Sequence, residues 1–394
     1  MKGNKAQPIN MKWVIATGVL ALAAIIAAFL PAASARAEVK PLANPEYQAV
    51  QLAEIPDATC LGCHGKPGLT TSLPGGDVLS ISIDENLYTT SVHGSQGMSC
   101  SSCHQDITGY PHPEVTAQSR SEYSFEGSLR CQQCHQEQFD LVEDSIHKIA
   151  QEEGNPLAPA CTDCHNPHTQ TKLKDADGQI LMEERVNIPV TCSKCHNEIN
   201  LEYLDSVHGE GVLEDGNPDS PTCTDCHSVH NVGEVDNAFR LRSPQLCADC
   251  HTDEEMMSKY GLSTDVLSTY VADFHGTTVT LFEKTAPDQL TNTPVCIDCH
   301  GVHNILRTDD PEKGIQVKAN LLKTCQRCHP DANENFPASW MSHYIASPTQ
   351  APLVYYVNLF YKILIPGLIG AMVIYVILDF IRRLIEKRKG VSHD

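Results

Sequence analysis

The feature that most constrains this chain is the arrangement of its cysteines. The chain has 18 cysteines in 394 residues, and all of them belong to Cys-x-x-Cys-His motifs. Few long apolar runs lie between the motifs, so the polypeptide alone cannot build a large hydrophobic core. The nine motifs are Cys60-Cys63-His64, Cys100-Cys103-His104, Cys131-Cys134-His135, Cys161-Cys164-His165, Cys192-Cys195-His196, Cys223-Cys226-His227, Cys247-Cys250-His251, Cys296-Cys299-His300 and Cys325-Cys328-His329.

This spacing predicts nine covalently attached c-type haems. Two thiols three residues apart on a short turn can form thioethers with the two vinyl groups of one haem, and the next histidine supplies an axial nitrogen to iron. Zinc sites and redox disulfides also use Cys-x-x-Cys, but neither explains a histidine after every pair. With roughly 35 residues for each haem, the porphyrins themselves are expected to form the core.

The remaining histidines match the haems in number. Of 19 histidines, nine belong to motifs and His393 lies in a basic tail. We expect the other nine to be the second axial ligands: His93, His112, His147, His168, His208, His230, His275, His303 and His343. An iron with two imidazole ligands has no open position for a substrate, which favours an electron carrier over an enzyme.

The motifs alternate in type, and the alternation predicts a repeat two haems long. Even-numbered motifs carry a histidine three residues further on, as in His165 and His168, although the first of them has it later, at His112. Such a histidine shares a turn with the motif histidine, so it should ligate a neighbouring haem. Odd-numbered motifs are followed by a Ser-x-His-like element. The units begin at Cys60, Cys131, Cys192 and Cys247, and a half unit begins at Cys325.

We therefore expect a mainly irregular and α-helical fold with little sheet, built as a linear array of two-haem modules. Apolar spacing predicts short helices over Gln136–Ile149 and Glu198–Val207. The tripeptides Gly154-Asn155-Pro156 and Gly216-Asn217-Pro218 predict turns.

Both ends of the chain indicate export and membrane attachment. Residues 1–37 resemble a signal peptide, with a basic lead, an apolar run and the A-x-A site Ala35-Arg36-Ala37, although an uncleaved anchor is an alternative. Residues 38–350 are then the extracytoplasmic nine-haem domain. Residues 351–381 are an interfacial segment and one transmembrane helix. The basic residues in 382–394 place the C-terminus in the cytoplasm by the positive-inside rule, and the haem domain on the periplasmic side.

The charge of the predicted haem domain limits its partners. Residues 38–350 hold 18 Lys and Arg against 46 Asp and Glu, a formal balance of −28. This argues against nucleic acid and suggests that a soluble or outer redox partner docks through a basic patch.

The motifs resemble the multihaem cytochrome c superfamily with doubled CxxCH modules. The resemblance covers residues 60–343 and is carried by Ser206-Val207-His208-Gly209, by Pro221-Thr222-Cys223-Thr224-Asp225-Cys226-His227-Ser228-Val229-His230, and by Ile107-Thr108-Gly109-Tyr110-Pro111-His112. The C-terminal anchor resembles that of multihaem subunits that work beside a membrane-embedded b-type cytochrome in quinol-linked chains.

The leading functional hypothesis is therefore electron transfer, without catalytic residues, between a quinol-oxidising membrane partner and an extracytoplasmic acceptor. The partner would be a b-type cytochrome or another quinol oxidoreductase subunit. The rival hypothesis is a multihaem reductase or oxidase of nitrogen or sulfur oxyanions, which needs one haem with an open position. Because the chain from His343 to the apolar segment is short, we expect the ninth motif to lie nearest the membrane and the first motif farthest from it if the modules stack linearly. An array that folds back is the alternative, and it would bring both ends to the membrane.

Overall fold

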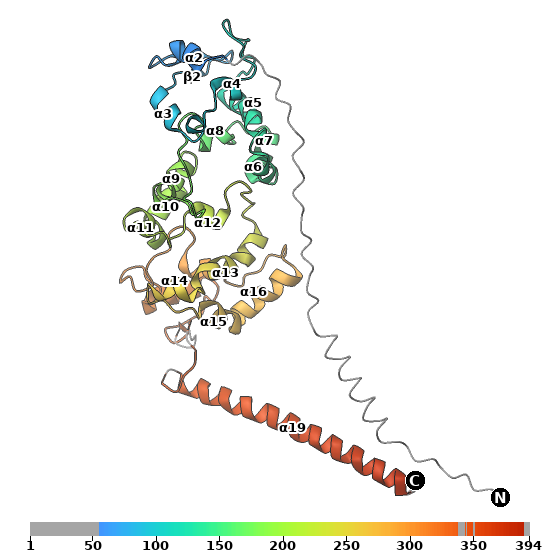
Figure 1. Cartoon of the computed structure of the whole chain (residues 1–394). Helices are drawn as coiled ribbons and strands as arrows, with labels where there is room; N and C mark the ends of the chain where they lie inside the picture. The colour runs from blue at the N-terminus through green and yellow to red at the C-terminus, as the bar shows by residue number, and fades with distance from the viewer. Residues whose placement is uncertain (1–54, 338–342, 344, 350, 390–394) are drawn as a thin grey trace, which may run out of the picture. The chain divides into compact units, whose positions relative to one another are not determined.

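The computed structural model describes residues 55–337, 343, 345–349 and 351–389 (Figure 1). The predicted signal peptide, Ser342 and His393 lie outside the described residues.

The described residues are mainly helical with little sheet, which confirms the predicted fold class (Figure 1). One antiparallel pair, β1 (Thr70–Ser72) and β2 (Val78–Ser80), lies beside the first motif. The helices that lie between successive motifs are α3 (Glu85–Thr90), the 3₁₀ helix η1 (Gly94–Gln96), α6 (Gln136–Val142), α7 (Ile146–Glu152), α10 (Asn197–Leu204), α11 (Val207–Leu213), α14 (Glu254–Ser258), α15 (Val266–Ala272) and α16 (Phe274–Thr285).

Odd and even motifs form different kinds of helix. Odd motifs lie at the C-terminal ends of α2 (Asp57–His64), α5 (Arg120–Gln132), α9 (Met182–Ser193), α13 (Asn237–His251) and α18 (Lys318–Gln326). Even motifs form one-turn helices of their own: α4 (Cys100–Cys103), α8 (Cys161–Cys164), α12 (Cys223–His227) and α17 (Cys296–His300).

A carboxylate inside the motif stabilises most of these one-turn helices. Asp163, Asp225 and Asp298 each accept a hydrogen bond from the backbone N–H of the residue before the first cysteine, at 2.6–2.8 Å. This is the reciprocal half of a capping box, and it satisfies a helix N-terminus that is otherwise too short to be stable.

The two helices predicted between motifs have the wrong boundaries. The segment predicted as one helix over Gln136–Ile149 is two, α6 and α7, because Ser145 is the N-cap of α7 and its Oγ accepts from the N–H of His147 at 3.3 Å. In the same way the helix predicted over Glu198–Val207 ends at Leu204, and Ser206 caps α11. The serine of the Ser-x-His element thus starts a new helix that carries the histidine.

The predicted turns are confirmed. Gly154 (φ 80°) and Gly216 (φ 61°) adopt the left-handed backbone conformation that glycine tolerates best. The side-chain carbonyls of Asn155 and Asn217 each accept from the N–H two residues on, at 3.0 Å. These are Asx turns, in which the side chain replaces a backbone acceptor.

The protein core is small for a chain of this size. Its main cluster among the described residues consists of Leu241, Val279 and Val295, with Tyr270, Phe282 and Ile297 packed against it. Such a cluster stabilises one module only, so the porphyrins remain the expected core of the others.

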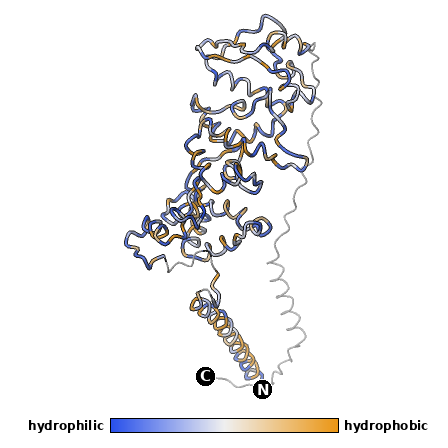
Figure 2. Tube along the Cα trace, turned by 90° about the vertical axis from the view of Figure 1, so that its left-hand side faces the viewer, coloured by the Kyte–Doolittle hydropathy of each residue, from blue (hydrophilic) through white to orange (hydrophobic). Residues whose placement is uncertain are grey.

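Among the helices of the described residues, one is long and apolar enough to cross a membrane. The helix α19 runs from Pro352 to Lys389, and its apolar stretch has a mean hydropathy of 2.3. Figure 2 shows it as predominantly hydrophobic, in contrast to the mixed colouring of the modules. The helix contains the predicted span and continues without a break into the basic segment that follows Ile381.

Candidate haem sites

Each motif histidine faces one histidine from outside the motifs. The centroids of the paired rings are 5.8–6.4 Å apart, and all 18 histidines predicted as ligands take part. In motif order the pairs are His64 with His112, His104 with His168, His135 with His93, His165 with His230, His196 with His147, His227 with His303, His251 with His208, His300 with His343, and His329 with His275.

This spacing fits one metal ion held between two imidazoles. Bonds of about 2.0 Å from one metal to two histidine nitrogens on opposite sides place the ring centroids roughly 6.2 Å apart. Direct stacking of two aromatic rings does not explain the set, because the interplanar angles range from 6° for His104 and His168 to 68° for His93 and His135. The pairs share the distance between their ring centroids, and an iron held between the two rings would determine that distance.

The pairing follows a rule along the chain. The histidine of a Ser-x-His element faces the next odd motif, as His147 faces His196. The histidine that follows an even motif faces the preceding even motif, as His168 faces His104 rather than its own neighbour His165. Neighbouring units therefore exchange histidines in both directions, and each haem site from the second motif to the ninth is completed by an adjoining unit.

The rule changes at the two ends of the array. At the first unit, His112 turns back to the first motif, since no unit precedes it in the described residues. At the last, His343 faces His300 of the eighth motif, at 6.2 Å and 21°, and Thr269 Oγ1 lies 3.3 Å from its Nδ1. The segment that leads to α19 is thus attached at the eighth motif. The ninth motif was expected to lie nearest the membrane because it precedes His343 in the chain, but His343 itself pairs with the eighth motif.

Burial keeps many of these histidines neutral. Desolvation, reinforced by His251, lowers the pKa of His208 to about 4. It also lowers the pKa of His168, whose neighbours His104 and His93 act in the same direction. A metal accepts only the unprotonated nitrogen of an imidazole, so burial at neutral pH holds these side chains in the binding form.

The cysteines form a continuous series from the first motif to the ninth. Within a unit the first cysteines of the two motifs are in contact, as Cys131 is with Cys161 and Cys192 with Cys223. Between units the even motif and the next odd motif have cysteines close enough to interact electrostatically, such as Cys103 and Cys134. The other contacts within a unit are Cys60 with Cys100 and Cys247 with Cys296. The other electrostatic pairs between units are Cys164 with Cys192, Cys226 with Cys250, and Cys299 with Cys328.

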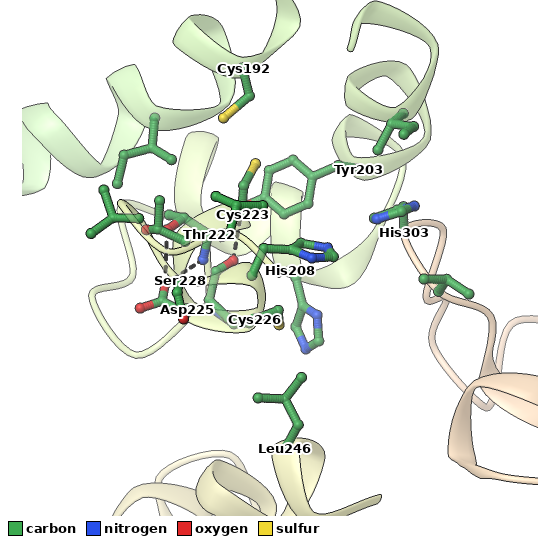
Figure 3. Close-up of a pocket in the computed structure, with 18 of the residues that line it drawn as sticks. Cys192, Tyr203, His208, Thr222, Cys223, Asp225, Cys226, Ser228, Leu246 and His303 are labelled. Atoms are coloured by element: carbon green, nitrogen blue, oxygen red, sulfur yellow. Dashed lines mark hydrogen bonds between the residues drawn. The ribbon is translucent and has the colours of Figure 1, made fainter. Parts of the chain in front are cut away.

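The motifs from the third to the eighth open into one large cavity. Motif histidines and cysteines line it together with apolar side chains such as Leu246 and Val295. Figure 3 shows the part around the sixth motif, where the thiols of Cys192 and Cys223 point toward each other and Tyr203 lies beside Cys223. An apolar cavity lined by paired imidazoles and thiols suits a stack of porphyrins, which are flat, apolar and bound through thioethers.

Charged pairs join the two motifs of a unit. Arg185 on α9 bonds Asp225 of the sixth motif at 3.1 Å, and Arg240 on α13 bonds Asp298 of the eighth motif at 2.6 Å. Arg240 also donates to the carbonyl of Thr293 at 2.9 Å. Arg185 Nε is buried without a hydrogen-bond partner among the described residues, so it can still donate to a haem propionate.

Replacing one of these arginines should destabilise its unit. We expect Arg240→Gln to cost about 1–3 kcal/mol, because it leaves the hydrogen-bonded Asp298 carboxylate without its charged partner. Thermal unfolding of the haem-loaded protein, followed by absorbance, measures the effect. The control is Arg242→Gln on the same helix, an exposed position. Equal melting temperatures for the two variants would contradict the role of Arg240.

Sequence reasoning missed a repeated donor beside the even motifs. The hydroxyls of Tyr88, Tyr203 and Tyr270 each donate to the carbonyl two residues before the first cysteine of an even motif, at 2.6–3.0 Å. Each tyrosine lies three residues before the first residue of the Ser-x-His-like element. In the second unit Val142 occupies that position, and Gln151 donates to the carbonyl of Pro159 instead. The recurrence of tyrosine at this offset was a signal that could have predicted the contact.

A second repeated contact links each unit to the next through the backbone. The N–H groups of Val92, Ile146 and Val207, each inside a Ser-x-His element, donate to the carbonyls of Gln170, Val232 and Ile305, all at 2.8 Å. Each acceptor lies five residues after an even-motif histidine in the following unit. The bond therefore holds the donated histidine in place at the point where it enters the neighbouring unit.

The helical fold, the doubled motifs and the paired histidines together define a multihaem c-type cytochrome. A family model for cytochrome c3 matches residues 92–197, and a model for the doubled CXXCH motif matches residues 216–256. A comparison with curated proteins finds no match. Over residues 92–197 and 216–256 the chain is similar to multihaem c-type cytochromes.

Proposed function

We propose that this protein is a nine-haem electron carrier anchored to a membrane. It relays electrons between a quinol-oxidising membrane partner, such as a b-type cytochrome, and an acceptor on the extracytoplasmic side. The haems supply the redox chemistry, in which each iron alternates between its ferrous and ferric states.

The observation that carries this proposal is the complete pairing of motif and non-motif histidines. Nine histidine pairs at 5.8–6.4 Å would supply two nitrogen ligands to each of nine haem irons. Such an iron has no open position for a substrate, so the pairing favours a carrier over a reductase of nitrogen or sulfur oxyanions.

The residues of the chain contribute position and environment. The exchange of histidines between units ties neighbouring haem sites together, and the cysteine contacts bring their attachment points side by side. Since tunnelling rates fall steeply with distance, a continuous series of short steps is what a relay requires. With porphyrins filling the cavity, its mainly apolar lining would leave little room for water and would limit the reorganisation that accompanies each transfer.

The membrane partner follows from α19. A single helix cannot enclose a quinone, so a quinol would have to be oxidised by another subunit in the membrane. The Gly367 and Ala371 side of α19 would allow a second helix to approach closely, as small residues do in membrane helix pairs. The net charge of −28 over residues 38–350 suits a soluble acceptor with a basic docking patch.

The test of the proposed function is a count of haems and of their spin states. We expect the purified protein to carry nine covalent haems per chain, measured as the mass increase of the denatured chain. Electron paramagnetic resonance of the oxidised protein should show only low-spin iron, because two imidazoles impose a strong ligand field. A high-spin ferric signal equivalent to one haem would contradict the carrier and support the reductase.

A further inference from the structure

One kind of helix contact recurs in every complete unit. The helix that carries the odd motif packs against the following even-motif helix, in the pairs α2 with α4, α5 with α8, α9 with α12, and α13 with α17. On the odd-motif helix, the residue in this contact lies three positions before the first cysteine of the motif. There Asp57 accepts from the N–H of Cys100 at 2.8 Å, Ser128 contacts the thiol of Cys161, and Pro189 and Pro244 are buried.

The fifth odd-motif helix, α18, has the same form but no such partner in its own chain. No Cys-x-x-Cys motif occurs in residues 330–389, where the next even motif would lie. Among the described helices, none packs against α18 as α17 packs against α13. Leu322 occupies the contact position on α18 and is only partly buried, in contrast to the fully buried Pro189.

A basic residue on α18 indicates which kind of helix could pack against it. Seven residues before the first cysteine, Arg185 and Arg240 pair with the aspartate between the cysteines of the next even motif. The corresponding residue on α18 is Lys318, which is exposed. Lys318, Leu322 and Cys325 lie on one side of the helix, at spacings of four and three residues. We call Lys318 and Leu322 together the α18 face.

The backbone hydrogen bond that links each unit to the next is missing at the element that precedes the ninth motif. Phe274 occupies the position of Val92, Ile146 and Val207, but its N–H donates to the Asp273 carboxylate at 2.5 Å instead of to a following unit. Its side chain is 79% exposed, while the three equivalent side chains are partly buried. The adjacent His275 faces His329 of the ninth motif. The two contacts that differ from the other units, the helix packing at α18 and the backbone bond at Phe274, therefore both belong to the ninth haem site.

We propose that the α18 face is the docking site for a haem-binding helix of another c-type cytochrome, one that carries a C-x-D-C-H motif. The aspartate of that motif would pair with Lys318, and the helix would pack on Leu322 as α17 packs on α13. Haem nine would thereby gain a neighbour in the partner, and the array would continue beyond this chain. The proposal rests on the proposed function in placing this partner within the quinol-linked complex.

A second copy of this chain is the poorer occupant. Two α18 helices related by a two-fold axis would bring Lys318 toward Arg327, the residue that each copy has between its ninth-motif cysteines. Like charges in close contact are unfavourable, whereas the four α-helix pairs within the chain combine different motif types. Charge complementarity therefore selects an even-type motif with a carboxylate. The motifs of that type in this chain, in α8, α12 and α17, are already packed against α5, α9 and α13, so a second copy offers none that is free to dock.

Site-specific cross-linking in native membranes tests the proposal. The photoreactive residue p-benzoylphenylalanine replaces Leu322 in the full-length, haem-loaded protein, and in a control it replaces Lys323. Lys323 is the matched position because residues two before the first cysteine, such as Leu129 and Val190, are exposed in other units. After irradiation, the cross-linked peptides are sequenced by mass spectrometry.

The expected product is a peptide from another protein that contains a C-x-D-C-H motif, formed from position 322 and not from position 323. Cross-links to a second copy of this chain, to a lipid, or to a peptide without a haem-binding motif would overturn the proposal, as would the absence of any cross-link specific to position 322. All of these readouts are independent of quinol oxidation, so the proposed function can fail while the docking site stands.

A charge reversal gives a second, quantitative test. In the chain with the photoreactive group at position 322, Lys318→Glu should lower the yield of the C-x-D-C-H cross-link by about fivefold, the effect of losing one ion pair and placing two carboxylates together. Lys323→Glu makes the same change in total charge and should leave the yield unchanged. Equal yields for both variants would exclude Lys318 from the contact.

Discussion

Removing the ninth haem should leave the other eight unreduced by quinol, whereas removing the first should not. The two variants are Cys325→Ala with Cys328→Ala, and Cys60→Ala with Cys63→Ala. Each removes the thioether attachment of one terminal haem. The series of cysteine contacts runs from the first motif to the ninth, so these two haems occupy opposite ends of the relay.

The direction of this prediction follows from the attachment of α19. His343 follows the ninth motif in the chain, and eight residues separate it from the start of α19 at Pro352, a path of at most about 32 Å when fully extended. With α19 in the membrane, as proposed, the eighth motif and the neighbouring ninth motif remain near the bilayer, and the ninth is the end of the series. We expect electrons to enter at haem nine and to leave at haem one.

The measurement is stopped-flow reduction by quinol in membranes that contain each variant and its native partner. For the ninth-haem variant we expect near-complete loss of reduction at the remaining haems. For the first-haem variant we expect unchanged reduction of the other eight, with slow delivery to the acceptor only. Both variants must retain eight covalent haems, and dithionite must reduce all eight. The reverse pattern would reverse the direction of the relay.

The sequence predicted the chemical parts of the sites because each part is set by local composition. A haem attachment needs two thiols and a histidine at fixed spacing, so the nine motifs could be counted directly. The second histidines could be counted as well, since their number equals that of the motifs. The family models support the c-type cytochrome modules that this count implies.

The pairing of these histidines could not be predicted, because it depends on contacts between units. His168 is three residues from His165 but faces His104 of the preceding unit, and nothing in the local spacing specifies that choice. The exclusion of its own haem followed from helix geometry, but the identity of the neighbour required the packing. The same holds for His343, whose partner is in the eighth motif and not in the adjacent ninth.

The helix boundaries failed for a different reason. Apolar spacing continues from α6 into α7, so a periodic pattern alone predicts one helix through Ser145. The serine hydroxyl instead caps a new helix, and the N–H of Ile146 leaves the helix to bond Val232 of the next unit. A tertiary contact therefore determines where the helix breaks, and the break orients His147 toward the neighbouring motif.

A substitution at His343 tests the corrected pairing most directly. His343→Met should raise the reduction potential of a single haem and leave the other eight nearly unchanged, because a neutral thioether favours ferrous iron over ferric iron. We expect a shift on the order of 0.1 V, within the range of about 0.8 V that axial ligands span. A spectroelectrochemical titration of the purified protein resolves it as one component displaced to higher potential.

Two further variants identify the haem that shifts. When the eighth haem is removed by Cys296→Ala with Cys299→Ala, the displaced component should disappear from the His343→Met protein, since His343 faces His300 at 6.2 Å. When the ninth haem is removed by Cys325→Ala with Cys328→Ala, the component should remain, because His329 faces His275 instead. The opposite result would return His343 to the ninth haem. Persistence of the wild-type titration in His343→Met would remove His343 from the ligand set altogether. Because the His343 segment leads directly to α19, a positive result would also establish that the membrane anchor and the eighth haem are joined through an axial ligand.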